Sequence, residues 1–502
     1  MSEIRDFVAA RLEIHAEFVD RSTVERTWDS DHTVWQDDPA ECADRLGWLA
    51  EPVSARELAP SLLDDRKGVA DLGIDRVLWC GMGGSSLFPD LVSRIALPRT
   101  SGLELHVLDT IHPDAIARAR EAHPARRTLF VFASKSGGTI ETRTQLDLYS
   151  ASTEATHLAV VTDARSQLDV LARENGWRVW NANPRIGGRF SALSHFGTVP
   201  AALAGVDPCA LADPAIEMAG RCRSSDDNPA LLLAEFLAAG VRSGRDKLTL
   251  VTPPALTGFG AWVEQLVAES TGKRGTGVLP VVDEPLGTPD EYGDDRMFVT
   301  YGDVAGLGAL HQTAHPLLDL GPATAGALGG ELFRWELATA WLGAALGINP
   351  FDQPDVDAAK RAATAALDQR AAPPPIQPPE PLLATLRPGD HIVVQAFVDP
   401  AGPLPARLDT LRLRLRRRFR AAVTIGIGPR YLHSTGQLHK GGPNTGVFLQ
   451  VVDSGRTDVA IPHRDFTFGE LLRAQADGDH AALLAAERRV ARVDLDELLA
   501  LA

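Results

Sequence analysis

The feature that most constrains the fold is an alternation of short apolar runs with segments long enough to be helices. The apolar runs lie at residues 76–80, 104–109, 128–134, 157–163 and 177–181. Strands that alternate with helices are typical of βαβ units, which build a parallel sheet covered by helices on both faces. In such sheets ligands bind beyond the carboxyl ends of the strands. The residues that follow each run are therefore candidates for a functional site.

The remainder of the chain divides around this block. Apolar positions at helical spacing predict an N-terminal helical appendage over residues 1–65, before a first α/β domain at 66–205. Further apolar runs predict a second α/β domain at 206–370. The proline-rich stretch 371–381 is typical of a linker. Strand-like runs and a helical end follow at 382–502, and we expect this C-terminal α/β segment to complete the second domain.

Charge and hydropathy exclude several kinds of partner. The 66 acidic and 50 basic residues leave a formal charge of −16, which disfavours binding to nucleic acid or to an anionic membrane. We find no window approaching the roughly 20 apolar residues needed to cross a bilayer. The first residues mix acids and bases where a signal peptide carries an apolar core. We expect a cytoplasmic protein without a membrane or nucleic-acid partner.

Two less specific patterns have structural explanations. The four cysteines, Cys42, Cys80, Cys209 and Cys222, show no C-x-x-C or zinc spacing, so we expect reduced thiols. The basic run at 411–420 has helical spacing, and it predicts a solvated helix face beside an apolar stripe.

Glycine-rich turns follow two of the predicted strands. They read "GMGGSSL" at 81–87 and "SKSGGTIET" at 134–142. Glycine lets backbone amides approach an anion, hydroxyl side chains add donors, and the following helix N-terminus favours negative charge. A phosphate or another small anion fits both turns, although each turn alone could merely end a strand. No Walker-type motif occurs. A dinucleotide fingerprint is a weak alternative, because Ser86 replaces its third glycine and Lys135 has no role in it.

Five motifs in a fixed order make the chain resemble the glucose-6-phosphate isomerase family, which is built on two sugar-isomerase (SIS) domains. Besides the two glycine-rich turns, they are "GGRFS" at 187–191, "QLVAESTGK" at 265–273 and "NPFDQPDVDAAK" at 349–360. The resemblance implies an α/β fold in which each SIS domain is a parallel sheet flanked by helices, an αβα sandwich. It also implies catalysis without metal or organic cofactor, and a homodimer.

A histidine motif of the family is displaced in this chain. The family places H-x-x-x-Q-x-x-x-x-G before its F-D-Q motif, whereas the matching "HSTGQLHKGG" lies here at 433–442, after the proline-rich stretch. This order resembles the isomerase part of transaldolase–isomerase fusion proteins, so a separately encoded transaldolase is a candidate partner. His433 would have to reach the pocket of its own chain or that of a partner subunit.

The resemblance assigns roles to residues whose chemistry suits them. A carboxylate can move a proton between C2 and C1 of a sugar, which makes Glu269 the expected base. The charged fork of Arg189 suits the developing enediolate, although an arginine there could equally be a surface residue. His433 and Lys360 would open the sugar ring, since imidazole titrates in the required range. The expected substrate-binding residues are Gly84, Ser85, Ser134, Lys135, Ser136, Thr139, Gln265 and Gln353.

Several of these assignments have alternatives. Gln353 and Lys360 are seven residues apart and so share a helix face, but an isolated helical lysine is usually solvent-exposed. A histidine after a strand can simply cap it, and His439, His311 and His315 are rival candidates for the role of His433. No carboxylate or thiol stands at ligand spacing beside His433 and His439, which argues against a metal site.

The expected function is interconversion of glucose 6-phosphate and fructose 6-phosphate through a cis-enediol. An isomerase of another 6-substituted hexose is an alternative, and its substrate could be mannose 6-phosphate or a 6-sulfonate sugar. A non-catalytic SIS-domain sensor of sugar phosphate is a third interpretation, although the presence of Glu269, Arg189 and Lys360 together disfavours it.

Overall fold

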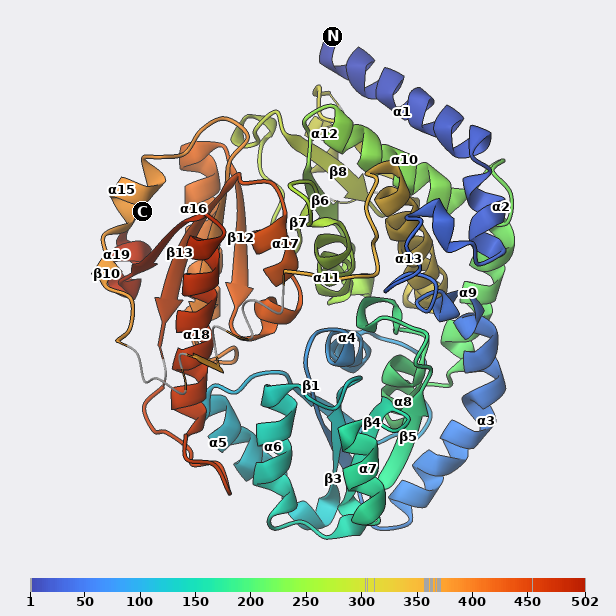
Figure 1. Ribbon diagram of the computed structural model, residues 1–502, viewed down its shortest axis with the longest axis vertical. Coiled ribbons are helices and arrows are strands. Elements are labelled where there is room, and N and C mark those ends of the chain that lie inside the picture. The colour runs from blue at the N-terminus through green and yellow to red at the C-terminus, as the bar shows by residue number, and fades with distance from the viewer. Residues whose placement is uncertain are drawn as a thin grey trace.

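The computed structural model describes residues 2–501 except 303, 305, 311, 356–360, 362, 363, 366, 368–371 and 454. In this part of the chain the strands form three parallel sheets whose helices pack around them (Figure 1). The predicted α/β class is therefore confirmed. Among the described helices, none has the length and apolarity required to span a bilayer.

The first sheet contains the five runs that the sequence predicts as strands. Its order is β2-β1-β3-β4-β5, and all neighbours are parallel. The strands are β1 (Arg76–Gly81), β2 (Glu104–Leu108), β3 (Thr128–Ala133), β4 (Leu158–Asp163) and β5 (Arg178–Ala182). Helices α4 (Leu87–Arg94), α5 (Pro113–Ala122), α6 (Ile140–Ser150), α7 (Gln167–Glu174) and α8 (His195–Leu203) connect or follow them.

The topology of this sheet brings the two glycine-rich turns together. β1 and β3 are neighbours, and Gly81 pairs with Ala133 at their carboxyl ends. The chain continues from β1 toward one edge of the sheet and from β3 toward the other edge, so the strand order reverses between them. Ligands of open parallel sheets bind at such a switch point.

The second sheet has the order β7-β6-β8-β9 and lies above the first in Figure 1. Its strands are β6 (Lys247–Val251), β7 (Leu279–Val281), β8 (Arg296–Thr300) and β9 (Leu317–Asp319). Its helices are α9 (Cys209–Arg221), α10 (Pro229–Arg242), α11 (Phe259–Thr271), α12 (Leu307–Leu310) and α13 (Leu328–Ala345). Helix α13 is buried on all sides, and Trp335 and Trp341 are fully inaccessible to solvent.

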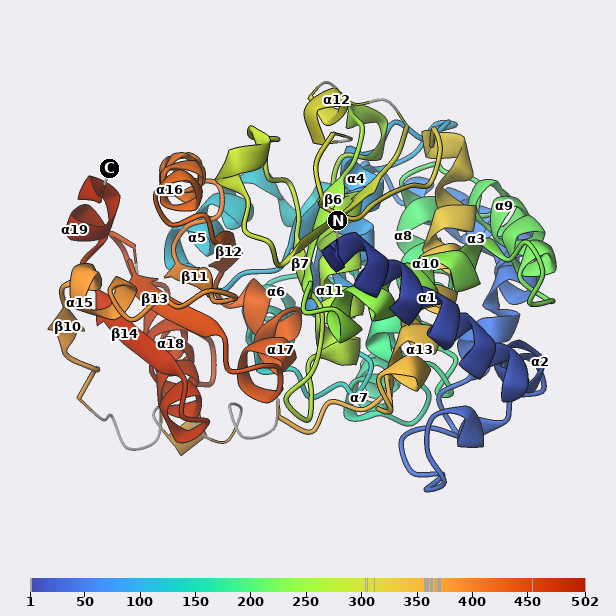
Figure 2. The same ribbon diagram turned by 90° about the horizontal axis from the view of Figure 1, so that it is seen from above.

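The C-terminal segment forms a third sheet of its own, which occupies the left side of both ribbon views (Figures 1 and 2). Its order is β10-β14-β13-β11-β12. The strands are β10 (Ile376–Gln377), β11 (His391–Phe397), β12 (Ala422–Ile427), β13 (Gly446–Val452) and β14 (Arg489–Val493). Its helices are α15 (Pro379–Leu383), α16 (Leu404–Phe419), α17 (Gly436–Gly441), α18 (Phe468–Ala485) and α19 (Leu495–Ala500).

All three sheets share one strand order. If the strands are numbered in chain order starting from β1, β6 and β11, each sheet has the spatial order second, first, third, fourth. In the third sheet these strands are β12, β11, β13 and β14. The sequence predicts that residues 382–502 complete the second domain, but in the structure their strands do not extend the second sheet. Their own sheet packs beside it instead, and the division into domains stays a prediction. The proline-rich stretch contains β10 and the start of α15.

The N-terminal helices lie against the helices of the second sheet, and the third of them also packs against α8 and β5 of the first sheet. They are α1 (Ser2–Asp20), α2 (Thr23–Trp28) and α3 (Glu51–Ala70). Phe7 meets Phe236 edge to face with ring centroids 5.3 Å apart, and the Trp341 indole donates to the Thr27 hydroxyl at 3.0 Å.

Helix α16 joins the third sheet to the second block. Leu408, Leu411 and Leu415 form the predicted apolar stripe in the core of the third sheet. The rest of the basic run is not simply solvated, however. Arg416 is only 1% exposed and contacts Glu291, and Arg412 donates to the Val282 carbonyl at 3.1 Å. The arginines thus stabilise the contact between the two blocks.

Candidate active site

The turn after β1 packs directly on the "GGRFS" segment. A Cβ atom on Gly84 would lie 2.1 Å from the Gly188 carbonyl oxygen, far inside van der Waals contact. Only glycine permits this approach. Ser85 lies next to it, half-buried, and its carbonyl accepts a hydrogen bond from the Trp79 indole at 2.7 Å.

The turn after β3 carries the hydroxyl groups expected to hold an anion. The Ser134 and Thr139 hydroxyls are 2.9 Å apart, and Ser134 Oγ accepts from the Gly137 amide at 3.2 Å. Ser136 is exposed, and its Oγ accepts from the Gly138 amide. Helix α6 starts immediately after Thr139, so its N-terminal amides face the same turn.

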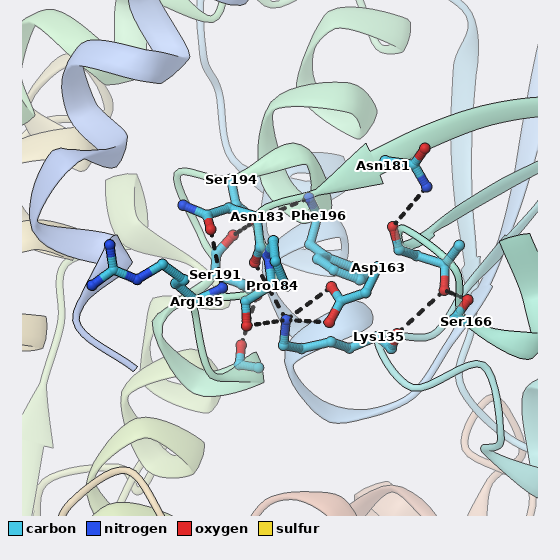
Figure 3. Close-up of polar contacts among 12 residues, drawn as sticks. Lys135, Asp163, Ser166, Asn181, Asn183, Pro184, Arg185, Ser191, Ser194 and Phe196 are labelled. Carbon is cyan, nitrogen blue, oxygen red and sulfur yellow. Dashed lines mark hydrogen bonds and ion pairs between the residues drawn. The ribbon is translucent and has the colours of Figure 1, made fainter. Parts of the chain in front are cut away.

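The Lys135 side chain points away from this turn. Its ammonium forms an ion pair with Asp163 at 2.7 Å and donates to the Asn183 carbonyl at 3.3 Å (Figure 3). Burial lowers the pKa of Lys135, opposed by its contact with Asp163. The charge of Lys135 is therefore neutralised by Asp163, and only the Lys135 backbone remains a candidate for binding substrate.

Helix α11 places Gln265 and Glu269 on one face, four residues apart. Gln265 Nε2 donates to Glu269 Oε2 at 3.0 Å, and Arg189 Nη1 lies 3.0 Å from Glu269 Oε1. Glu269 is 6% exposed and Arg189 5%. The carboxylate is therefore held from both sides by a donor and a positive charge.

The Arg189 guanidinium links three segments that are distant in the sequence. It donates to the Ser270 hydroxyl at 3.0 Å, to Gln353 Oε1 at 2.8 Å and to the Pro350 carbonyl at 2.9 Å. These contacts fix the plane of the fork beside Glu269. They also bring Gln353, from the fifth motif, to the catalytic residues that the sequence predicts.

The displaced histidine reaches this group within its own chain. It ends the short helix η10 (Arg430–His433), which follows the edge strand β12. The His433 carbonyl accepts from Gln265 Nε2 at 2.8 Å, and the His433 ring Nε2 lies 2.8 Å from Glu141 Oε1. The third sheet therefore packs so that η10 meets both α11 and α6.

The sequence interpretation missed Glu141, although it stands in the quoted "SKSGGTIET". Glu141 is 1% exposed and also accepts from Gln475 Nε2 at 2.6 Å. Burial would raise its pKa, but the charge of His433 and these hydrogen bonds lower it overall. The carboxylate therefore stays ionised beside the imidazole. Its burial depends on helix α18, which no local pattern around residue 141 reveals.

Two further residues tie the motifs together. Lys273 Nζ donates to the Asn349 and Asp352 carbonyls at 2.7 Å. Burial lowers its pKa to about 8. Gln437, from the displaced motif, donates to the Gly272 carbonyl at 2.9 Å. Both residues belong to motifs that are visible in the sequence, but the motifs alone do not indicate what either residue does.

The other histidines lie elsewhere. His439 is 3% exposed, and burial lowers its pKa well below the usual range. His315 packs on Phe298, with ring centroids 5.6 Å apart. Lys360 and His311 lie outside the described residues. Among the described residues, His433 is thus the histidine that the structure brings to Gln265.

Comparisons with known proteins agree with this arrangement. The family model described as phosphoglucose isomerase matches residues 58–288. Glucose-6-phosphate isomerases of Synechococcus sp. and Prochlorococcus marinus are 31% and 32% identical over 348 and 346 residues. Each match covers 58% of this chain, and 65% and 63% of the respective relatives. The chain therefore spans somewhat less than two thirds of their length.

Solved structures support the fold. A hypothetical protein from Thermus thermophilus aligns with a TM-score of 0.62 at 23% identity, over 73% of this chain and 98% of its own. A glucose-6-phosphate isomerase from Chlamydia trachomatis aligns with a TM-score of 0.60 at 18% identity, over 72% of this chain and 86% of its own.

Fold and site together define an α/β protein that gathers two glycine-rich turns, an arginine-held carboxylate and a histidine beyond the ends of parallel strands. Within that class, residues 58–288 match the phosphoglucose isomerase family model, and the chain is similar to glucose-6-phosphate isomerases over 58% of its length.

Proposed function

We propose that this protein interconverts glucose 6-phosphate and fructose 6-phosphate through a cis-enediol. The observation that carries the proposal is the Glu269 carboxylate, held at 3.0 Å by both Arg189 and Gln265. A base that moves a proton between adjacent carbons needs a fixed position and a neighbouring positive charge for the oxyanion.

In this mechanism Glu269 removes the C2 proton of the open-chain aldose and returns it to C1. Negative charge develops on the sugar oxygens as the proton leaves. Arg189 stabilises that charge, because its guanidinium is always protonated and its orientation is fixed by Ser270 and Pro350. Gln265 and Gln353 orient the carboxylate and the guanidinium.

Ring opening precedes proton transfer, and His433 is the residue assigned to it. Glu141 at 2.8 Å orients the imidazole, which can deliver a proton to the ring oxygen. The family resemblance gives Lys360 a part in the same step.

The distal phosphate is assigned to the two glycine-rich turns. Ser134, Ser136 and Thr139 offer hydroxyls and the amide-rich start of α6, while Gly84 and Ser85 line the adjacent turn. A phosphate held there fixes one end of the sugar, so that C1 and C2 fall near Glu269.

The sugar is the least determined part of the proposal. The exposed Ser136 hydroxyl leaves room at the anion turn for a sulfonate in place of phosphate. Mannose 6-phosphate and a 6-sulfonate sugar are therefore second candidates, while the sensor interpretation predicts binding without turnover. A cytoplasmic location, a homodimer and a separate transaldolase partner belong to the same proposal, as does catalysis without a cofactor.

A substrate panel tests these alternatives. The chain and its Glu269→Gln variant are assayed with glucose 6-phosphate, fructose 6-phosphate, mannose 6-phosphate and 6-deoxy-6-sulfoglucose. We expect turnover of the first two, and a loss of at least about 1000-fold in the variant with binding retained. Near-native rates in the variant would refute the assignment of the base. Binding without turnover by the native chain would favour the sensor.

A further inference from the structure

A cavity of about 420 Å³ lies where the carboxyl ends of all three sheets meet. Its walls include Asp109 after β2, Asp283 after β7, Pro400 after β11 and Gly428 after β12. Parallel sheets bind ligands at this edge, and the volume is typical of a small-molecule site. The described residues of the candidate active site do not line the cavity. It shares α11 and η10 with that site but lies on their other side.

The charges on the walls are unbalanced. Five carboxylic acids and three arginines line the cavity, a formal excess of two negative charges. The arginines already have partners. Arg94 and Arg430 both contact Asp90, at 2.9 and 3.0 Å, and Arg430 also lies 3.2 Å from Asp109.

The third arginine, Arg412, also has partners, so Glu264 and Asp283 are the two carboxylates that these arginines do not pair with. Arg412 lies 3.4 Å from Asp409 and donates to the Val282 carbonyl. Within the described part of the chain, neither Glu264 nor Asp283 has a basic side chain at ion-pair distance. The charge of Asp283 is close enough to disfavour the ionised form of Glu264.

An independent polar atom also lacks a partner here. Thr424 lines the cavity and is 8% exposed, and its buried hydroxyl has no hydrogen-bond partner among the described residues. Buried hydroxyls are normally satisfied, so the Thr424 hydroxyl is available to bond with a group placed at this wall. Val282, Ile425 and Ile427 make the neighbouring wall apolar.

We propose that this cavity binds a small organic cation, with one or two amino groups on a short aliphatic frame. The ammonium lies between Glu264 and Asp283, the frame packs on Val282 and Ile425, and Thr424 accepts a hydrogen bond from the amine. The apolar wall suits methylene groups, which a bare metal ion does not offer. The proposal goes beyond the isomerase function and does not rest on it.

The acids of the cavity make binding dependent on pH. Burial raises the pKa of Glu264 to about 7, opposed by Arg430. An amine binds the ionised carboxylate, so its affinity rises as pH increases through 7. One group of this pKa gives an increase of about tenfold between pH 6 and pH 8. The other charged groups that face the cavity are Asp90, Arg94, Asp109, Asp409, Arg412 and Arg430.

Titration calorimetry with probes of one carbon skeleton tests the proposal. The native chain is titrated with putrescine, 1,4-butanediol, succinate and magnesium chloride at pH 6 and pH 8. We expect binding of putrescine alone, tighter at pH 8. Absence of putrescine binding, equal binding of the diol, or binding of magnesium with the same stoichiometry would each overturn it.

Variants locate the binding site. Glu264→Gln and Asp283→Asn should each weaken putrescine binding by about tenfold or more, and Glu264→Gln should also flatten its pH dependence. The exposed Glu13→Gln removes one negative charge elsewhere and should change nothing. Glu269→Gln should bind putrescine normally, which separates this site from the active site. Native affinity in Glu264→Gln would refute the proposal, and circular dichroism verifies that each variant is folded.

Discussion

Replacing Gly84 by alanine tests the contact on which the geometry of the candidate active site depends. The added Cβ would lie 2.1 Å from the Gly188 oxygen, 2.5 Å from the Gly188 carbonyl carbon and 3.1 Å from its Cα. These are backbone atoms, so no side-chain rotation can relieve the overlap. Carbon and oxygen need about 3.5 Å, and the two segments must therefore separate by about 1.4 Å.

Such a separation affects stability modestly and catalysis strongly. Overpacking of this kind costs about 1–3 kcal/mol of unfolding free energy. Arg189 directly follows Gly188, so the guanidinium moves with the displaced backbone and leaves its 3.0 Å contact with Glu269. A displacement of about 1 Å at a reacting centre lowers the rate by about 100-fold.

The opposing glycine provides a matched control. A Cβ on Gly188 would meet no atom within 4 Å, so Gly188→Ala should keep both rate and stability. Both variants are assayed by coupling glucose 6-phosphate formation to a dehydrogenase, and their unfolding is followed in urea. Equal rates for Gly84→Ala and Gly188→Ala would refute the role given to this contact.

Three further changes separate catalysis, positioning and packing. His433→Asn should slow conversion of cyclic substrate about 100-fold or more, but should slow deuterium exchange at C2 of the open-chain form far less; equal losses would contradict ring opening. Gln475→Leu removes a hydrogen bond that lowers the pKa of Glu141, so the acid limb of the pH–rate profile should move to higher pH and kcat should fall about tenfold. An unmoved limb would indicate a structural role only. Arg416→Met should lower the unfolding free energy by about 3–5 kcal/mol, whereas the exposed Arg414→Met should stay within about 0.5 kcal/mol; similar urea midpoints would show that the buried pair contributes little.

Short-range patterns account for the parts of the structure that the sequence predicted well. The five strands of the first sheet follow from apolar runs, and their ends locate both glycine-rich turns. The helical spacing of Gln265 and Glu269 places them on one face, where the structure finds them 3.0 Å apart. Such features depend on a few neighbouring residues, so their periodicity is visible without knowledge of the fold.

Contacts between distant segments could not be predicted in the same way. The partner of Lys135 is Asp163, and finding it requires knowing that β3 and β4 are neighbours in register. The partner of His433 is Glu141, which lies 292 residues earlier in the chain. Arg412 and Arg416 are buried because α16 meets the loop after β7, and their charge pattern alone indicates a solvated helix.

The order of the third sheet explains how a displaced histidine still reaches the same group of residues. In the shared strand order the second strand lies at the sheet edge, and in this sheet it is β12. The segment after an edge strand has no neighbouring strand beyond it, so it is free to contact another block. Here it carries η10 to the turn after β1, where a Cβ on Gly83 would lie 2.7 Å from the His433 oxygen. The place of the histidine motif along the chain therefore matters less than its position directly after an edge strand of the sheet. A histidine supplied from this edge meets Glu141 and Gln265 of its own subunit, so the contacts described for it do not require a second copy of the chain.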